Sequence, residues 1–134
     1  MSFFARKKYG VSKFEYQFFP KSNIDAYESF ILRNSGNDWE QTMLRDGYIN
    51  SIIRLTGVDY QQYRPTIGYI NGEYWGIYNM REKISEHFIS SHHDVPTESI
   101  SLLAYNGSFE NNLELIHGSK NDFLELLYYF KNIN

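Results

Sequence analysis

The chain has 134 residues, a net charge of −3 at neutral pH and no cysteine. This length is enough for one domain with a hydrophobic core, and the absence of cysteine excludes disulfides and cysteine-bound metals. The charge gives no electrostatic footprint for nucleic acid. No apolar run approaches the roughly 20 residues that span a bilayer, and residues 1–10 lack the pattern of a signal peptide.

The first part of the chain is expected to form an edge segment and two strands. Residues 1–10 are expected to be a loose or edge segment. Alternating aromatic residues predict a strand over Lys13–Phe19, which Pro20 ends. A second strand is predicted over Tyr27–Arg33, followed by the loop Asn34–Asn37 because of its polar and glycine content.

A helix is predicted to begin at Asp38 and to end at Thr56-Gly57. The Asp38 carboxylate is expected to cap it, with Gln41 completing a capping-box pattern. Gly47 weakens the helix by roughly 1 kcal/mol, which indicates that another group packs close to it. The predicted buried stripe consists of the apolar residues at helical spacing, which are Leu44, Tyr48, Ile52 and Leu55.

A β-hairpin is predicted around Asn71-Gly72, because this dipeptide favours a two-residue turn in which both residues have positive φ. The predicted pairs are Ile70 with Glu73, Tyr69 with Tyr74 and Gly68 with Trp75, where the small glycine leaves room for the indole. Both faces of the hairpin are mostly apolar or aromatic, so both are expected to be covered.

The last third is predicted to hold two helices and two short strands. The predicted elements are a helix over Glu82–His92 that buries Ile84, Phe88 and Ile89, a strand over Ile100–Tyr105, a polar loop over Asn106–Asn112, a small strand over Leu113–Ile116 and a helix capped by Ser119 that presents Phe123, Leu124, Leu127 and Phe130. This element order predicts an α+β fold, an antiparallel sheet with flanking helices. Twelve tyrosines and ten phenylalanines favour an aromatic-rich core over a surface that stacks on sugars or bases.

Several catalytic and metal-binding patterns are missing from the sequence. The four histidines lack zinc-site spacing, and the glycines follow neither phosphate-loop spacing. Leu44-Arg45-Asp46 superficially matches the catalytic-loop triplet of protein kinases, but we reject that match because it lies inside the predicted helix. Arg33 has two interpretations. A cation at the end of a strand can hold a phosphate with nearby loop amides, or it can form an ion pair with Asp38 or Asp46, which spacing favours.

Several segments together resemble the CotH family, the spore coat protein H type of atypical protein kinases. The resemblance covers most of residues 11–134. The segments that carry it are Phe30–Asp38, Arg45-Asp46, Tyr63-Arg64-Pro65, Asn71–Glu82 with its NGEYWGIYN-x-RE run, Ile84, Phe88-Ile89 and Ser101-Leu102-Leu103.

The resemblance implies a protein-kinase small lobe over about residues 11–80 and a hinge with the start of a large lobe over residues 81–134. It makes Arg33 the phosphate-anchoring cation and Asp38–Leu55 the helix that positions it. The candidate ATP-binding residues are Arg33, Asn79, Met80, Arg81 and Glu82, and the candidate supporting residues are Asp38, Arg45 and Asp46.

The resemblance also implies what this chain is not expected to do alone. Family members carry catalytic and metal-binding aspartates in the large lobe, and no such motif follows Ser119–Asn132, so the chain is expected to be an incomplete kinase domain that lacks efficient catalysis. ATP, Mg²⁺ and a protein substrate are expected for the intact parent.

The alternative is a non-catalytic binding or adhesion module of a spore-coat or cell-surface protein. An apolar surface left exposed by the missing lobe is expected to favour homo-oligomers. The family permits a spore-coat, cell-surface or secreted location.

Overall fold

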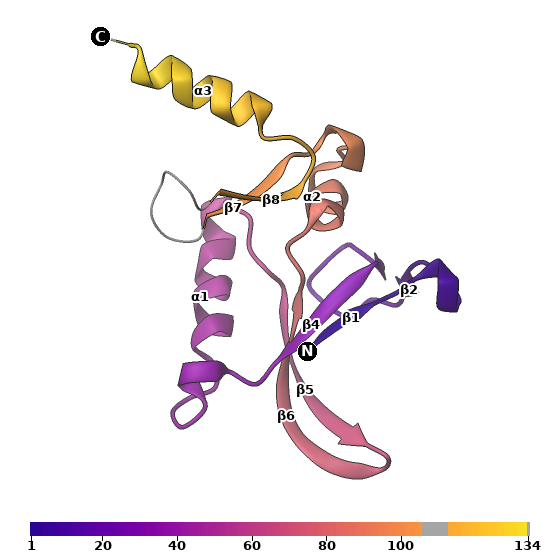
Figure 1. Cartoon of the computed structure of the whole chain (residues 1–134). Helices are drawn as coiled ribbons and strands as arrows, with labels where there is room; N and C mark the ends of the chain where they lie inside the picture. Colours follow the sequence, from indigo (N-terminus) through magenta and orange to yellow (C-terminus); the bar gives the residue numbers. More distant parts are fainter. Residues whose placement is uncertain (106–112, 134) are drawn as a thin grey trace. The chain divides into compact units, whose positions relative to one another are not determined.

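The computed structural model describes residues 1–105 and 113–133 and has an α+β fold with antiparallel sheets and three α-helices in that part (Figure 1). The loop predicted over Asn106–Asn112 lies outside the described residues. The helices are α1 (Arg45–Ile53), α2 (Glu86–His93) and α3 (Asn121–Lys131). The strands are β1 (Ser2–Phe4), β2 (Phe14–Glu15), β3 (Ala26–Tyr27), β4 (Ser29–Arg33), β5 (Tyr63–Ile70), β6 (Glu73–Glu82), β7 (Leu102–Tyr105) and β8 (Leu113–His117). The chain divides into two units, Met1–Lys83 and Ile84–Asn134.

The first unit is built on a four-stranded antiparallel sheet with the order β1-β4-β6-β5. The N-terminal segment, predicted as loose or edge, forms an edge strand over β1, which pairs with β4. The strand predicted over Lys13–Phe19 is wrong beyond β2, which pairs with β3. There the N–H groups of Tyr16 and Phe18 donate to carbonyls two residues earlier, so the chain turns instead of extending.

An aromatic cluster packs around Phe30 on one face of this sheet. The Phe30 ring lies 4.9 Å from Phe3, 5.2 Å from Phe14 and 4.9 Å from Phe18 between centroids. Phe19 is 1% exposed beside it. The aromatic-rich core expected from composition is therefore present, and these rings contribute both apolar area and edge-to-face contacts.

The helix predicted from Asp38 starts seven residues later, at Arg45. A 3₁₀ turn, η2 (Gly36–Asp38), precedes it, and Met43 has a positive φ of 58°, which interrupts a right-handed helix. The Asp38 carboxylate still serves the helix start, because it accepts the N–H of Arg45 at 2.9 Å. Asp38 thus caps the helix across a loop and does not itself begin it. At the other end, α1 continues into the short 3₁₀ turn η3 (Arg54–Thr56).

The buried stripe predicted for this helix is wrong. Its four residues are exposed, with exposed fractions of 53% for Leu44, 66% for Tyr48, 48% for Ile52 and 80% for Leu55. The helix turns a polar side to the sheet instead. Asn50 Oδ1 accepts the N–H of Gln61 at 3.1 Å, and the ring of Tyr63 packs against Gly47. The close packing predicted at Gly47 is therefore confirmed.

The predicted hairpin turn is confirmed, with φ of 52° at Asn71 and 83° at Gly72. Tyr69 pairs with Tyr74 as predicted. The register then shifts between Gly68 and Tyr69, so Gly68 pairs with Gly76 and Trp75 is the extra residue of a bulge. The ring of Tyr78, not the indole, fills the space beside Gly68. The prediction that both hairpin faces are covered is wrong, since the apolar residues of the hairpin are exposed, namely Ile67, Tyr69, Ile70, Tyr74, Trp75 and Ile77.

In the second unit, the helix predicted from Glu82 begins at Glu86. Ser85 caps it by accepting the N–H of Phe88. Phe88 is buried as predicted, whereas Ile84 is 54% exposed.

The two predicted strands pair as β7 and β8. In α3, Ser119 Oγ accepts the N–H of Asn121, but the predicted stripe is open to solvent at Leu124 and Phe130. No helix in the described ranges is long and apolar enough to cross a membrane.

Candidate functional site

Strand alternation places three of the candidate residues on one face of the sheet. In the β4–β6 ladder, Arg33 pairs with Asn79 and Ile31 pairs with Arg81. Side chains two residues apart on a strand share a face, so Arg33, Asn79 and Arg81 point to the side of α1. Met80 and Glu82 point to the opposite side for the same reason.

A single carboxylate on α1 joins the two arginines. Asp46 Oδ2 lies 2.9 Å from Arg81 Nη1 and 3.3 Å from Arg33 Nη1. The arginines differ in environment, because the Arg81 side chain is 6% exposed and that of Arg33 is 49% exposed. Of the two partners predicted for Arg33, Asp38 and Asp46, the structure confirms Asp46. The three side chains carry one net positive charge, and Arg33 presents it to solvent.

Arg81 is held by a network that reaches the segment before β5. Its Nη2 donates to Gln61 Oε1, and Gln61 Nε2 donates to the Glu82 carbonyl at 2.7 Å. Asn50 closes the network, because its side chain accepts from the Gln61 N–H and donates to the Asp46 carbonyl. Burial lowers the pKa of Arg81, and the Asp46 carboxylate opposes that shift, so the guanidinium stays charged.

Gln61 and Asn50 were not predicted as site residues. Neither belongs to a chemical motif. Their side chains join the network around Arg81 only because the segment before β5 lies against the polar side of α1. The tandem Gln61-Gln62 next to Tyr63 was visible in the sequence, but it carries no spacing signal that points to an arginine twenty residues later.

Asn79 connects the sheet to the loop that precedes α1. It is 4% exposed, and its Nδ2 donates to Ser35 Oγ at 2.6 Å and to the Met43 carbonyl at 3.1 Å. Both acceptors lie where the backbone has positive φ. Asn79 therefore fixes the loop from which α1, and with it Asp46, projects toward the arginines.

Met80 and Glu82 lie away from this cluster. Glu82 is 3% exposed and pairs in register with Phe30, and its Oε2 accepts the N–H of Gln62 at 2.9 Å. Met80 pairs with Leu32 and with Arg64. The structure thus brings Arg33, Asn79, Arg81 and Asp46 together and leaves Met80 and Glu82 on the other face.

Asp38 and Arg45 serve the start of α1 rather than the arginine cluster. Asp38 Oδ2 accepts from the Arg45 N–H at 2.9 Å and from Thr42 Oγ1 at 2.8 Å, and Arg45 Nη2 lies 3.5 Å from Asp38 Oδ1. The Arg45 N–H bond is the largest cause that lowers the pKa of Asp38, against the effect of burial. The ionised carboxylate therefore stabilises the loop and the helix start.

We expect Asp38→Asn to lower the urea midpoint of unfolding at pH 7, because the amide loses the charge that the helix start favours. A carboxyl with a lowered pKa contributes stability above the unfolded-state pKa, and this contribution is lost as the pH falls. The midpoints of variant and wild type should therefore converge as the pH falls below about 4. A gap that stays constant from pH 7 to pH 3 would contradict the role given to this charge.

Gly47 and Tyr63 set how closely α1 approaches β5. A Cβ atom at Gly47 would lie 2.8 Å from Tyr63 Cε1 and 3.0 Å from its Cγ. The Tyr63 ring would therefore have to move as a whole. Burial raises the pKa of the Tyr63 hydroxyl, which has no hydrogen-bond partner among the described residues.

Gly47→Ala is therefore expected to destabilise the protein although alanine favours helices. Overpacking costs about 1–3 kcal/mol and the helix gains about 1 kcal/mol, which leaves a net loss of about 1 kcal/mol in urea unfolding. Ser51→Ala, at an exposed residue one turn later in the same helix, serves as the control and should change stability little. A stabilised Gly47→Ala variant would show that α1 can move away from Tyr63 freely.

The described residues include no group of three or more histidine or acidic side chains that could hold a metal ion. The Asp46 oxygen nearest the arginines is already shared by two guanidiniums. These residues do not fit a magnesium site.

The comparisons with curated proteins and with solved structures gave no match. The comparison with protein-family models matched residues 1–132 to the family described as CotH kinase protein. All the residues placed above lie within that match.

Proposed function

The chain belongs to the CotH kinase family, and from this membership we propose that the face bearing Arg33 is the phosphate-binding side of a nucleotide site. The chain would supply the nucleotide-facing half of a CotH-like protein kinase. The proposal covers binding of ATP and assigns no catalytic residue.

The charge balance around Asp46 is the observation that carries the proposal. One carboxylate neutralises one of two guanidiniums, and the buried Arg81 makes the shorter contact at 2.9 Å. Arg33 is half exposed and keeps the longer contact at 3.3 Å, so its guanidinium can also donate to a second anion. Arginine matches the geometry of phosphate oxygens well.

The remaining candidate residues take positioning roles in this proposal. Asp46 and Arg81 orient Arg33, and Asn79 holds the loop from which α1 starts. Asp38 and Arg45 stabilise that start. The proposal is confined to the Arg33 face, which leaves Met80 and Glu82 outside it.

Titration with ATP and Mg²⁺, followed by calorimetry, tests the proposal. We expect saturable binding that weakens about tenfold or more in Arg33→Ala, since a hydrogen bond between charged groups is lost. Arg6→Ala is the matched control, because Arg6 is an exposed arginine beside β1 and should leave binding unchanged. Equal binding by wild type and Arg33→Ala, or no saturable binding, would overturn the proposal.

A second candidate function is a non-catalytic binding module that uses the β5–β6 hairpin. Tyr74 is 61% and Trp75 59% exposed on a hairpin whose apolar residues are open to solvent on both strands, and exposed aromatic residues are enriched at protein interfaces. The partner we propose is a second copy of this chain. Light scattering should then show association that increases with concentration and is lost in the double variant Tyr74→Ser/Trp75→Ser, whereas a monomer at high concentration would contradict it.

A further inference from the structure

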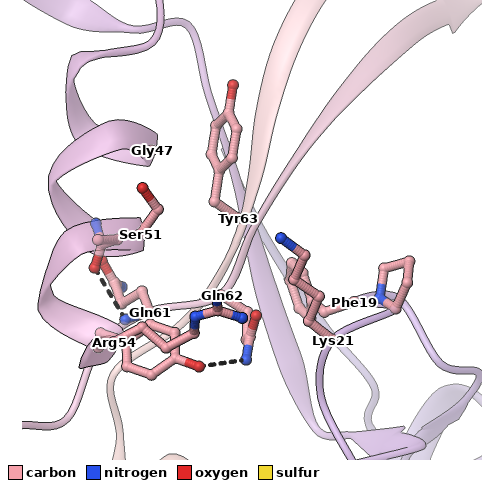
Figure 2. Close-up of a pocket in the computed structure, with 11 residues that line it drawn as sticks. Phe19, Lys21, Gly47, Ser51, Arg54, Gln61, Gln62 and Tyr63 are labelled. Carbon is pink, nitrogen blue, oxygen red and sulfur yellow. Dashed lines mark hydrogen bonds between the residues drawn. The ribbon is translucent and has the colours of Figure 1, made fainter. Parts of the chain in front are cut away.

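A pocket of about 200 Å³ lies in the first unit between α1 and the segment around Phe19. One wall is the side of α1 that carries Gly47 and Asn50, and the ring of Tyr63 lies next to it (Figure 2). Phe19 forms part of the opposite wall and is almost fully buried. Three of the residues that line the pocket, Phe19, Tyr60 and Tyr63, are aromatic, so a flat ring can pack there.

Two cations point into this pocket, and none of the described residues that line it is acidic. Figure 2 shows the Lys21 ammonium and the Arg54 guanidinium extending from opposite sides into the space between α1 and the segment 19–21. Neither cation has an ion pair or hydrogen bond with a described residue. Both are exposed, so they are available to an anion.

Except for the Tyr63 hydroxyl, which has no hydrogen-bond partner among the described residues, the neutral polar groups of the pocket are already used within the protein. The Asn50 side chain bonds Asp46 and Gln61, Ser51 Oγ donates to the Tyr48 carbonyl, and Gln62 Nε2 donates to the Tyr60 hydroxyl. A neutral polar ligand would therefore find few free partners here. A carboxylate would find two cationic donors.

We infer that this pocket binds a small aromatic carboxylic acid. The ring would lie between Phe19 and the Tyr63 side of α1, and the carboxylate would be held by Lys21 and Arg54. The volume is below the roughly 300–1,000 Å³ of pockets for drug-sized ligands, so a single or fused bicyclic ring fits and a nucleoside triphosphate does not. The site is separate from the Arg33 face, although Asn50 and Gln61 belong to both.

Indole-3-acetate is the probe, and backbone amide chemical shifts of the 134-residue chain are the readout. We expect saturable shifts at Gly47, Ser51 and Gln61, and no comparable shifts with the uncharged indole-3-acetamide. Lys21→Glu and Arg54→Glu should each weaken binding about tenfold or more. Lys7→Glu is the matched control, because it makes the same charge change at an exposed lysine in the N-terminal 3₁₀ turn.

Three results would overturn the inference: no shifts at millimolar probe, equal shifts with the amide, or unchanged binding in both pocket variants. Lys21→Gln gives a milder charge loss if either reversal disturbs the fold, and it should still weaken binding. The outcome is independent of the nucleotide proposal. Saturating ATP should leave the indole-3-acetate shifts in place, and Arg33→Ala should not change them.

Discussion

Asp46→Ala is expected to lower the free energy of unfolding by about 3 kcal/mol. The substitution removes the only carboxylate that pairs with Arg81 in the described part of the chain, and the Arg81 side chain is 6% exposed. A buried charge left without its partner costs much more than an exposed pair contributes. Gln61 still accepts from Arg81, so the loss of stability should stay below the largest losses seen when one partner of a buried ion pair is removed. Urea unfolding, followed by circular dichroism, measures the change.

The control for this prediction removes the other arginine from the same carboxylate. Arg33→Ala should cost less than about 1 kcal/mol, because its side chain is 49% exposed and solvent already screens the pair. Similar losses in both variants would show that burial of Arg81 does not dominate the cluster. The contrast also matters for the proposed function, since Arg33→Ala should weaken the proposed nucleotide binding while the protein stays folded.

The sequence predicted features that depend on neighbouring residues better than features that depend on distant ones. Asn71-Gly72 was a reliable turn, because two residues in succession need positive φ and few residue types allow it. Gly47 was correctly associated with a close neighbour, because a glycine inside a helix costs stability unless something requires it. The spacing favoured an ion pair for Arg33 but left Asp38 and Asp46 both open as the partner.

The helix α1 shows where such reasoning fails. Its apolar stripe at Leu44, Tyr48, Ile52 and Leu55 predicted a buried face, yet these side chains are exposed. The residues that determine which side of α1 faces the sheet are Asp46, Asn50 and Gly47. Asp46 pairs with two arginines, Asn50 bonds the Gln61 amide, and Gly47 packs against a tyrosine ring, all from distant segments. A period of 3.6 residues gives the faces of a helix but not which one finds a partner. The irregularity at Gly68 is a different case, because a glycine inside a strand can mark a bulge, but Gly68 was interpreted instead as room for the Trp75 indole.

Gly118→Ala is expected to lower the stability of the second unit by about 3 kcal/mol, from two separate causes. Gly118 has φ of 77°, a conformation that costs alanine about 1–2 kcal/mol. A Cβ atom there would also contact the Ile100 carbonyl oxygen and lie 2.8 Å from Ser101 Cα. These are backbone atoms just before β7, so the β7–β8 hairpin would have to shift as a whole.

Gly57→Ala separates the two causes. Gly57 has nearly the same φ, 76°, and open space where its Cβ would lie, so the variant carries the backbone strain of about 1–2 kcal/mol without the contact. Amide hydrogen exchange in β7 and β8 for Gly118→Ala, and in α1 for Gly57→Ala, gives the free energy of opening next to each site. Equal losses would mean that φ alone limits Gly118, whereas a larger loss at Gly118 shows that the close approach of Ile100 and Ser101 excludes any side chain there.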